Sequence, residues 1–355
     1  MDIATAMDEV AERDWEERSV PPVRLALVGV GGFVRRRALP ALDDSDYCTA
    51  AALVTGDLDD ARHVAGEHGV ETILTYEEFH GGAATDAYDA VYVATPNAHH
   101  LRVVETAAEQ GKPVLCEKPL EATVERAERL VSACQSGDVP LMTAYRLQAD
   151  PVVRRARELV AGGAIGDPVK VHGEFSVDLL AADPDPDQWR LDADLAGGGA
   201  LVDLGVYPLN TTRFVLDADP AAVHGTTATT GPPFDDVEEH VAFEARFPGV
   251  ATGVFTASYR AHVEDRLQVL GTGGQVELEN AFYAEAHRTL RVERDGKRWT
   301  VEGEGTNEVR EEFDYFAHAL RNGAPLEPDG EDGLTDMRTI EAVYEADRTG
   351  ERVTL

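Results

Sequence analysis

The sequence predicts an α/β chain built of two domains, the first with a parallel sheet between helices and the second an α+β domain with a large, open, mostly antiparallel sheet. Three observations predict it. Short apolar runs alternate with helical stretches up to residue 145. A glycine-rich turn follows the first of those runs. Further along, strands of period two are separated by tight turn signals.

The first domain is predicted from its alternation of strands and helices, which is typical of a parallel sheet with helices on both faces. One helix, 57–69, has both of its end signals, because Asp57 can cap the first turn and Gly69 can end the last. The expected strands are 23–30, 49–56, 88–95, 112–117 and 139–145. The other expected helices are 97–110 and 123–135.

The second domain is predicted from consecutive hairpins, which indicate an antiparallel sheet. Their turns are Pro248–Gly249, Thr272–Gly273–Gly274 and Asp295–Gly296. The expected strands are 167–177, 240–247, 251–260, 266–279 and 289–303, and the expected helices are 151–162, 308–322 and 331–348. We therefore expect an arm at 1–20, a first domain at 21–146 and a second at 147–355, with the last helix and tail free to pack back on the first domain.

The charge balance excludes several classes of partner. The chain has 355 residues and a net charge of −34, so its surface repels nucleic acid and anionic lipid. Its hydrophobic fraction of 43% and its clear apolar periodicity argue against disorder. It has no apolar run long enough to span a bilayer, and its acidic N-terminus resembles neither a signal nor a transit peptide. We expect a cytoplasmic protein.

No metal site is expected. The chain has no CxxC or HExxH motif, and the adjacent His99 and His100 would diverge on a helix. The three cysteines are odd in number and lie in apolar or helical stretches. They are interpreted as small buried residues in a reducing compartment.

The turn after the first strand fits part of the GxGxxG motif. Gly29 and Gly31 take its first two positions, and Gly32 and Phe33 continue the turn. Val34 stands where a third small residue is usual, which weakens the motif. A lone GxG can be a simple turn, but its place after the first strand of an alternating chain favours a Rossmann domain that binds a dinucleotide.

The end of the second strand favours NADP over NAD. An NAD site usually carries a carboxylate there to hold the ribose 2′-hydroxyl. Here Thr55 and Gly56 occupy that place and leave room for a 2′-phosphate. The basic candidates to pair with it are Arg35, Arg36, Arg37 and Arg62, although arginines could also simply balance the acidic surface.

Five segments resemble the glucose–fructose oxidoreductase and inositol dehydrogenase (Gfo/Idh/MocA) family along nearly the whole chain. They are ATPNAHH (94–100), CEKPL (116–120), AYR (144–146), QWRLDADLAGGGALVDLGVYPLNTTRF (188–214) and GLTDMRTIEAVYEADRTGERV (333–353). Within the family, 188–214 is most similar to members that oxidise sugars at C1. The resemblance implies an NADP-dependent aldose 1-dehydrogenase, with D-xylose as the expected substrate and D-glucose or other aldoses as further ones.

The resemblance also implies the catalytic residues. Lys118, one of only four lysines, would lie beside the nicotinamide and substrate, with a cis peptide before Pro119. Tyr207 would be the general base for the C1 hydroxyl, because a phenol has a pKa of about 10 that a nearby ammonium lowers. If the segment GGGALVDLGVYPLN (197–210) is helical, Asp203, Tyr207 and Asn210 share a face. Asp203 would then orient substrate or Lys118, and Asn210 would bind a sugar hydroxyl.

Further contacts are implied in the same way. Arg146 would contact the substrate, and Tyr283 would reach the site from the sheet domain. The residues expected to line the cofactor are Thr95, Pro96, Asn97, His100, Glu117, Trp189 and Arg190, the last two at the nicotinamide end. Taken singly, Tyr207 could be a packed helix tyrosine and Lys118 a surface lysine. Their occurrence together with Asp203 favours the catalytic interpretation.

Other functions stay open at this point. One is an enzyme of the glucose–fructose oxidoreductase type, which holds NADP permanently and alternates two sugars. Another is a non-catalytic NADP-binding regulator, since a fold can host many functions. A third is a protein that serves assembly alone. In each case the open sheet is expected to pair with another subunit, as a homodimer or homotetramer, because an uncovered apolar face is costly.

The acidic, lysine-poor composition predicts a halophilic protein. Carboxylates retain water and cations, and their mutual repulsion is screened over about 3 Å in 1 M salt. The temperature of thermal unfolding should therefore rise from low to molar KCl. An unfolding temperature that shows no gain with salt would contradict this expectation.

Overall fold

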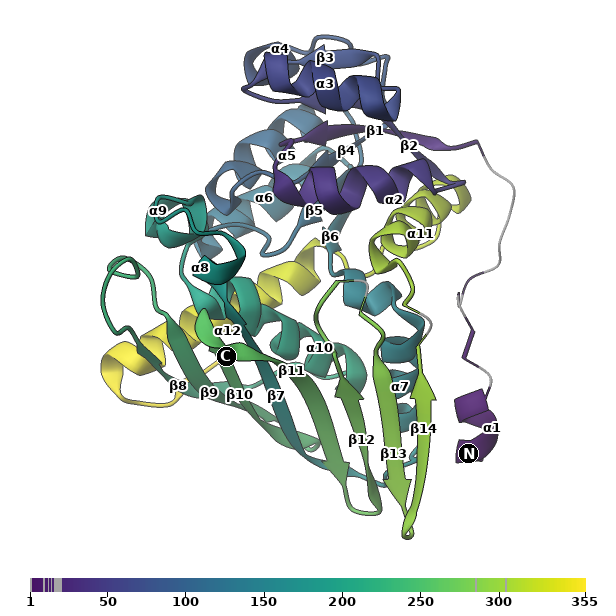
Figure 1. Cartoon of the computed structure of the whole chain (residues 1–355), viewed down its shortest axis with the longest axis vertical. Helices are drawn as coiled ribbons and strands as arrows, with labels where there is room; N and C mark the ends of the chain where they lie inside the picture. Colours follow the sequence, from purple (N-terminus) through teal and green to yellow (C-terminus); the bar gives the residue numbers. More distant parts are fainter. Residues whose placement is uncertain are drawn as a thin grey trace. The chain divides into compact units, whose positions relative to one another are not determined.

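The computed structural model describes residues 2–8, 10, 11, 13, 15, 21–284, 286–303 and 305–355. Contacts divide the chain into two compact units, whose elements are labelled in Figure 1. The parallel-sheet unit comprises residues 15–146 and 309–334, and the open-sheet unit comprises residues 1–14, 147–308 and 335–355. The domain limits expected from the sequence stay a prediction. The two units are groups of residues that contact one another, and such grouping does not establish where a domain begins or ends.

The parallel-sheet unit is built on a sheet whose described strands follow the order β3-β2-β1-β4-β5-β6. All neighbouring strands pair in parallel. The order reverses between β1 and β4, and open α/β sheets bind ligands beyond the carboxyl ends of strands at such a point. The strands are β1 (Val23–Val28), β2 (Cys48–Val54), β3 (Thr72–Leu74), β4 (Ala90–Val93), β5 (Val114–Glu117) and β6 (Leu141–Ala144).

Helices bury their apolar sides against this sheet. The predicted end signals of α3 are confirmed: the Asp57 side chain accepts from Asp60 N at 3.1 Å, and Gly69 is left-handed with φ 67°. Phe313 and Phe316 of α11 lie in the same core as the β1 leucines. The helices are α2 (Leu39–Asp43), α3 (Leu58–His68), α4 (Tyr76–His80), α5 (His100–Glu109), α6 (Val124–Ser136) and α11 (Glu308–Asn322).

The open-sheet unit contains the larger sheet, whose described strands follow the order β14-β13-β12-β11-β7-β10-β9-β8-β15. Neighbours are antiparallel except β7 and β10, which are parallel. The strands are β7 (Pro168–Asp178), β8 (Ala222–Ala228), β9 (His240–Phe247), β10 (Ala251–Ser258), β11 (Arg260–Gly271), β12 (Gly274–Glu279), β13 (Thr289–Arg294), β14 (Lys297–Glu302) and β15 (Val353–Thr354). The predicted fold class is confirmed, although β3, β8 and β15 were not predicted.

Helices cover one face of the larger sheet. They include α7 (Pro151–Ala161), α10 (Val206–Leu216) and part of α12 (Gly330–Thr349) (Figure 1). Two short helices, α8 (Leu179–Ala182) and α9 (Ala193–Ala196), lie between β7 and α10 in the sequence. Buried and exposed side chains alternate along β9, as this arrangement requires. Val241, Phe243 and Ala245 are buried, whereas Ala242 and Arg246 are exposed. One face of the sheet is therefore core, and the other is open.

The predicted N-terminal arm begins with a helix, α1 (Ile3–Asp8). Further along the arm, the Ala11 carbonyl accepts a hydrogen bond from Arg154 at 3.2 Å. Residues 1, 9, 12, 14 and 16–20 lie outside the described residues. Among the helices that the structure describes, none has the length and apolarity needed to cross a bilayer.

Candidate active site

The turn after β1 has the backbone geometry that its glycines predict. Gly29 has φ 94°, and a Cβ there would lie 2.7 Å from the Ala94 carbonyl oxygen, so a side chain is excluded. Gly31 faces open space, with no atom within 4 Å of where its Cβ would be. The following turn is a π-helix, Val34–Ala38, and Val34 is buried in the core. The turn thus leaves the open approach to the backbone that a pyrophosphate requires.

The four candidate arginines differ in their surroundings. Arg35 donates to the Val30 carbonyl at 2.9 Å and pairs with Asp60, and that hydrogen bond lowers the pKa of Asp60. Arg62 is exposed and pairs with Asp59. The Arg36 guanidinium lies over the glycine turn, because a Cβ on Gly32 would be 2.7 Å from its Nη1. Arg37 is half-buried on the same π-helical turn.

Thr55 and Gly56 follow the end of β2, as predicted. Thr55 is buried, its amide donates to the Leu74 carbonyl at 3.0 Å, and its hydroxyl accepts from Asp57 N at 3.2 Å. No carboxylate stands at either position. This local arrangement agrees with the space expected for a 2′-phosphate.

The loop after β4 carries Thr95, Pro96 and Asn97. The Thr95 hydroxyl is buried and has no hydrogen-bond partner, and Asn97 is 4% exposed. His100 is fully buried, with its ring nitrogens 3.0 Å from the Thr95 carbonyl and 3.2 Å from the Leu120 carbonyl. Burial lowers the pKa of His100. His100 thus ties this loop to the one after β5, and its contact with a cofactor stays a prediction.

Polar groups converge at the carboxyl ends of β4, β5 and β6. Glu117 accepts a hydrogen bond of 2.6 Å from the Tyr92 hydroxyl. Burial raises the pKa of Glu117, while Tyr92 and the charges of Lys118 and Arg146 partly offset the effect. The Lys118–Pro119 peptide is cis, as predicted. Lys118 and Arg146 therefore lie near one carboxylate at the edge of the sheet where ligands bind.

These features fit a dinucleotide. The space in front of Gly31 would admit a phosphate close to the backbone, and the unpartnered Thr95 hydroxyl could hydrogen-bond to a bound group. Within the ranges that the structure describes, no three His, Cys, Asp or Glu side chains gather as a metal site would require.

The open-sheet unit carries the remaining catalytic candidates on one continuous helical segment. Leu201–Gly205 form a π turn and Val206–Leu216 form α10, so the predicted helix is present but its first turn is wider than an α turn. Asp203 lies within the π turn and accepts hydrogen bonds from Arg190 Nε at 3.2 Å and from the Tyr259 hydroxyl at 3.1 Å. The π turn thus presents the carboxylate to both donors.

Arg190 is fixed from two sides, by Asp203 and by Trp189. Its guanidinium lies over the Trp189 ring, 4.6 Å from the ring centroid. Burial opposes its charge, but the carboxylate of Asp203 and the two nearby tyrosines outweigh burial, so the pKa of Arg190 is raised. The two tyrosines are Tyr259 and Tyr207, which brings the predicted base close to this ion pair.

Tyr207 belongs to an aromatic cluster. Its ring meets the Phe175 ring edge-on at 5.4 Å, and Phe175 meets Tyr283 at 5.7 Å. Phe282 completes the cluster at 6.3 Å from Tyr207. Tyr283 is 40% exposed, so it lies at the rim of the cluster. The structure thus brings together Tyr207 and Tyr283, which were predicted from segments far apart in the chain.

Asn210 lies in a buried polar network. Its Nδ2 donates to Asp336 at 2.8 Å, and its Oδ1 accepts from Gln148 at 2.9 Å. Asp336 also pairs with Arg213 at 2.9 Å. Both ends of the Asn210 amide are thus used by protein groups, and a sugar hydroxyl would have to share or replace one of them. Its predicted contact with substrate stays a prediction.

Two groups beside these candidates were missed by sequence reasoning. Tyr259, which is 1% exposed, supports Asp203, and Phe175 supports Tyr207. Tyr259 is the second-last residue of the strand predicted at 251–260, and Phe175 lies within the one predicted at 167–177. No local signal in the sequence shows which side chains they contact. Those partners depend on the pairing of β7, β10 and β11, which the sequence does not determine.

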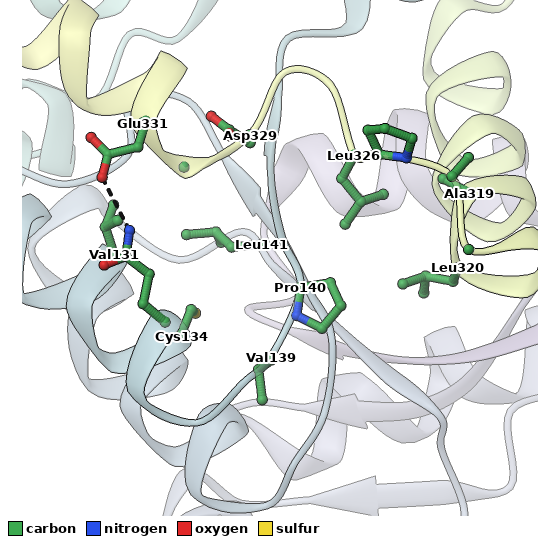
Figure 2. A pocket seen from close by; sticks show the side chains of 15 residues that line it. Val131, Cys134, Val139, Pro140, Leu141, Ala319, Leu320, Leu326, Asp329 and Glu331 are labelled. Carbon is green, nitrogen blue, oxygen red and sulfur yellow. Dashed lines mark hydrogen bonds between the residues drawn. The ribbon is translucent and has the colours of Figure 1, made fainter.

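A separate hollow of about 470 Å³ lies elsewhere in the parallel-sheet unit (Figure 2). It is lined mainly by apolar groups of α6, the start of β6 and the segment after α11, among them Val131, Leu141 and Leu326. Gln135 and Glu331 hydrogen-bond at 3.1 Å beside it. The hollow is at the start of β6, whereas Arg146 and the polar cluster follow its end. It is therefore distinct from the candidate site.

Comparison with known proteins agrees with this geometry. Residues 23–145 match the oxidoreductase family with an NAD-binding Rossmann fold, and residues 153–277 match the GFO/IDH/MocA C-terminal domain. The chain is 50% identical to a D-xylose 1-dehydrogenase (NADP(+)) of Haloarcula marismortui, over 97% of this chain and 96% of that one. It is 33% identical to D-xylose 1-dehydrogenase (NADP(+)) 2 of Haloferax volcanii, over 93% and 98%.

A solved structure extends the likeness to three dimensions. The aldose-aldose oxidoreductase from Caulobacter crescentus, complexed with glycerol, has a TM-score of 0.89 and 32% identity. The match covers 94% of this chain and 100% of that one. With both family models matched in order along the chain, this protein belongs to the GFO/IDH/MocA family of oxidoreductases.

Proposed function

We propose that this protein is a cytoplasmic, NADP-dependent aldose 1-dehydrogenase that oxidises D-xylose at C1 to the lactone, with D-glucose and other aldoses as further substrates. The observation that carries the proposal is the 50% identity with the Haloarcula D-xylose 1-dehydrogenase over nearly the whole of both chains. Of the catalytic candidates, Lys118 directly follows β5, Asp203 lies in the π turn and Tyr207 lies in α10.

Each of these side chains has a distinct task in the proposed reaction. The bound nicotinamide supplies the acceptor for the hydride that leaves C1. Tyr207, as its phenolate, accepts the proton of the O1 hydroxyl, so that a C1–O1 double bond forms. Lys118 donates a hydrogen bond to O1 and favours its negative charge as the proton leaves. Asp203 is held by Arg190 and Tyr259 and orients the sugar toward Tyr207.

Residues of the parallel-sheet unit would hold the cofactor. The turn at Gly29, Gly31 and Gly32 would receive the pyrophosphate, and Arg36, which lies over Gly32, would add a cation there. Thr55 and Gly56 would leave room for the 2′-phosphate of NADP. Local cations matter in this chain, because its net charge of −34 repels a polyanionic cofactor.

A second candidate function is favoured by the likeness to the Caulobacter aldose-aldose oxidoreductase, at 32% identity. In that case NADP would stay bound while one sugar is oxidised and another reduced. The two functions differ in whether NADP co-purifies with the protein. They also differ in whether a reduced sugar forms without added cofactor.

We also propose that the open face of the larger sheet pairs two or more copies of the chain. The face includes a hollow lined by His172, Glu174, Val254, Thr256 and others, and Val254 is 43% exposed there. Burying an apolar side chain in the middle of an open sheet against another subunit is more favourable than leaving it exposed to water. Light scattering should give a multiple of 38.4 kDa, whereas a mass of one chain would contradict pairing.

The function is tested by a panel of aldoses, each assayed with NADP and with NAD in molar KCl. We expect the highest kcat/KM with D-xylose and a lower KM for NADP than for NAD, because Thr55 and Gly56 offer no carboxylate to repel the 2′-phosphate. A clear preference for NAD would defeat the NADP assignment. Binding of NADP without turnover of any aldose would favour the regulatory protein.

The base is tested by Tyr207→Phe. Removing the hydroxyl should lower kcat by roughly 10²- to 10⁴-fold, the usual contribution of a general base. NADP binding, followed by fluorescence titration, should not change. Tyr315→Phe is the matched control, because its hydroxyl donates to the Pro325 carbonyl at 3.1 Å outside the candidate site. Turnover close to that of the wild type would remove Tyr207 from the mechanism.

A further inference from the structure

The helix that carries Asp203 and Tyr207 begins at an unusual junction. The first amides of a helix have no acceptor within the helix itself and need partners from elsewhere. Here three consecutive amides donate to a single residue, Glu238. Gly199 N donates to its Oε2 at 2.9 Å, and Leu201 N donates to its Oε1 at 2.8 Å. Between them, Ala200 N donates to its backbone carbonyl at 3.1 Å.

The glycine run before the helix permits this approach. A Cβ on Gly199 would lie 2.1 Å from the Glu238 carbonyl oxygen, so the two backbones meet at a distance that a side chain would prevent. Gly198 has φ 156°, and a Cβ there would lie 2.1 Å from the Tyr344 hydroxyl. That hydroxyl donates to Glu238 Oε1 at 2.9 Å. Glu238 is thus held in turn by α12.

The turn that follows is one that needs support. Leu201–Gly205 are π-helical, a conformation that is rare and occurs mostly as single turns. Asp203 lies two residues beyond the last amide that Glu238 holds, and Tyr207 lies one turn further. A shift at Leu201 would therefore move both side chains. Carboxylate–amide hydrogen bonds are stronger than neutral ones, and a negative charge suits a helix N-terminus.

We propose that Glu238 is a positioning residue of this dehydrogenase: by capping the π turn from outside the helix, it fixes where Asp203 and Tyr207 stand. The proposal rests on the function proposed above. In this proposal Glu238 contacts neither substrate nor cofactor. Glu238 acts by holding the backbone of residues 199–201 in place.

The neighbouring residue offers a matched control. Glu239 is fully buried and equally well bonded, accepting from Thr230 N at 2.8 Å and from the Thr230 hydroxyl at 2.7 Å. It also faces Arg260 at 3.4 Å. None of these partners belongs to 199–201. Glu239→Gln therefore perturbs a buried carboxylate at the same place in the chain without loosening the π turn.

The experiment compares Glu238→Ala, Glu238→Gln and Glu239→Gln with the wild type. Glu238→Ala should lower kcat by roughly 10- to 100-fold, because misplacing a reacting group by about 1 Å costs that much. Its affinity for NADP should stay unchanged. Glu238→Gln should recover part of the loss, since its amide oxygen can still accept one of the two hydrogen bonds that Gly199 N and Leu201 N donate to the carboxylate. Glu239→Gln should keep the kcat of the wild type even where its unfolding temperature falls.

Hydrogen exchange gives a readout that does not depend on turnover. Amides 199–201 should exchange faster in both Glu238 variants and stay protected in Glu239→Gln. Unchanged exchange, or a kcat of Glu238→Gln and Glu238→Ala within twofold of wild type, would overturn the proposal. Equal loss of kcat in Glu239→Gln would also overturn it. If the wild type oxidises no aldose, the proposed function fails, and exchange still decides whether Glu238 holds the turn. If Glu238→Ala does not fold, Glu238→Gln carries the test.

Discussion

In the proposed reaction, two side chains have to reach one sugar oxygen: the ammonium of Lys118 and the phenol of Tyr207. Neither group is sufficient alone, because the phenolate removes a proton while the ammonium favours the charge that removal creates. The parallel-sheet unit holds the ammonium of Lys118 in place, and the open-sheet unit holds the phenol of Tyr207. Most of the catalytic effect would then come from positioning.

Each unit holds a carboxylate in place near its catalytic candidate. In the parallel-sheet unit, Glu117 lies at the end of β5 beside the cations of Lys118 and Arg146 and accepts from the Tyr92 hydroxyl. In the open-sheet unit, Asp203 is held by Arg190 and Tyr259. A charged pair with several hydrogen-bond partners keeps a defined geometry where a single flexible side chain would not. Such sites preorganise the groups around a reaction before substrate arrives.

Sequence reasoning succeeded where the signal is local. The caps at Asp57 and Gly69 and the glycine turn at Gly29 follow from residues adjacent in the chain. The cis peptide before Pro119 was implied by the family resemblance of the segment that contains it. Sequence reasoning failed where geometry depends on distant partners. The π turn at Leu201–Gly205 could not be distinguished from an α turn, because its capping residue Glu238 is far along the chain.

The same limit applies to individual site residues. The sequence places Asn210 on the helix face of Asp203 and Tyr207 but does not show that Gln148 and Asp336 hydrogen-bond to its amide. The role of Tyr259 depends on how the junction between β10 and β11 places it against the π turn. Short strands such as β8 and β15 were missed because they are stabilised by their neighbours in the sheet and have weak patterns of their own.

A crystal structure with NADP and D-xylose bound would test the central requirement directly. We expect Lys118 Nζ and Tyr207 Oη each within hydrogen-bond distance of the sugar O1, about 2.6–3.2 Å, with C1 facing the nicotinamide. A complex in which the sugar O1 is reached by one of these groups and not the other, or in which the sugar lies away from the nicotinamide, would contradict the proposed mechanism.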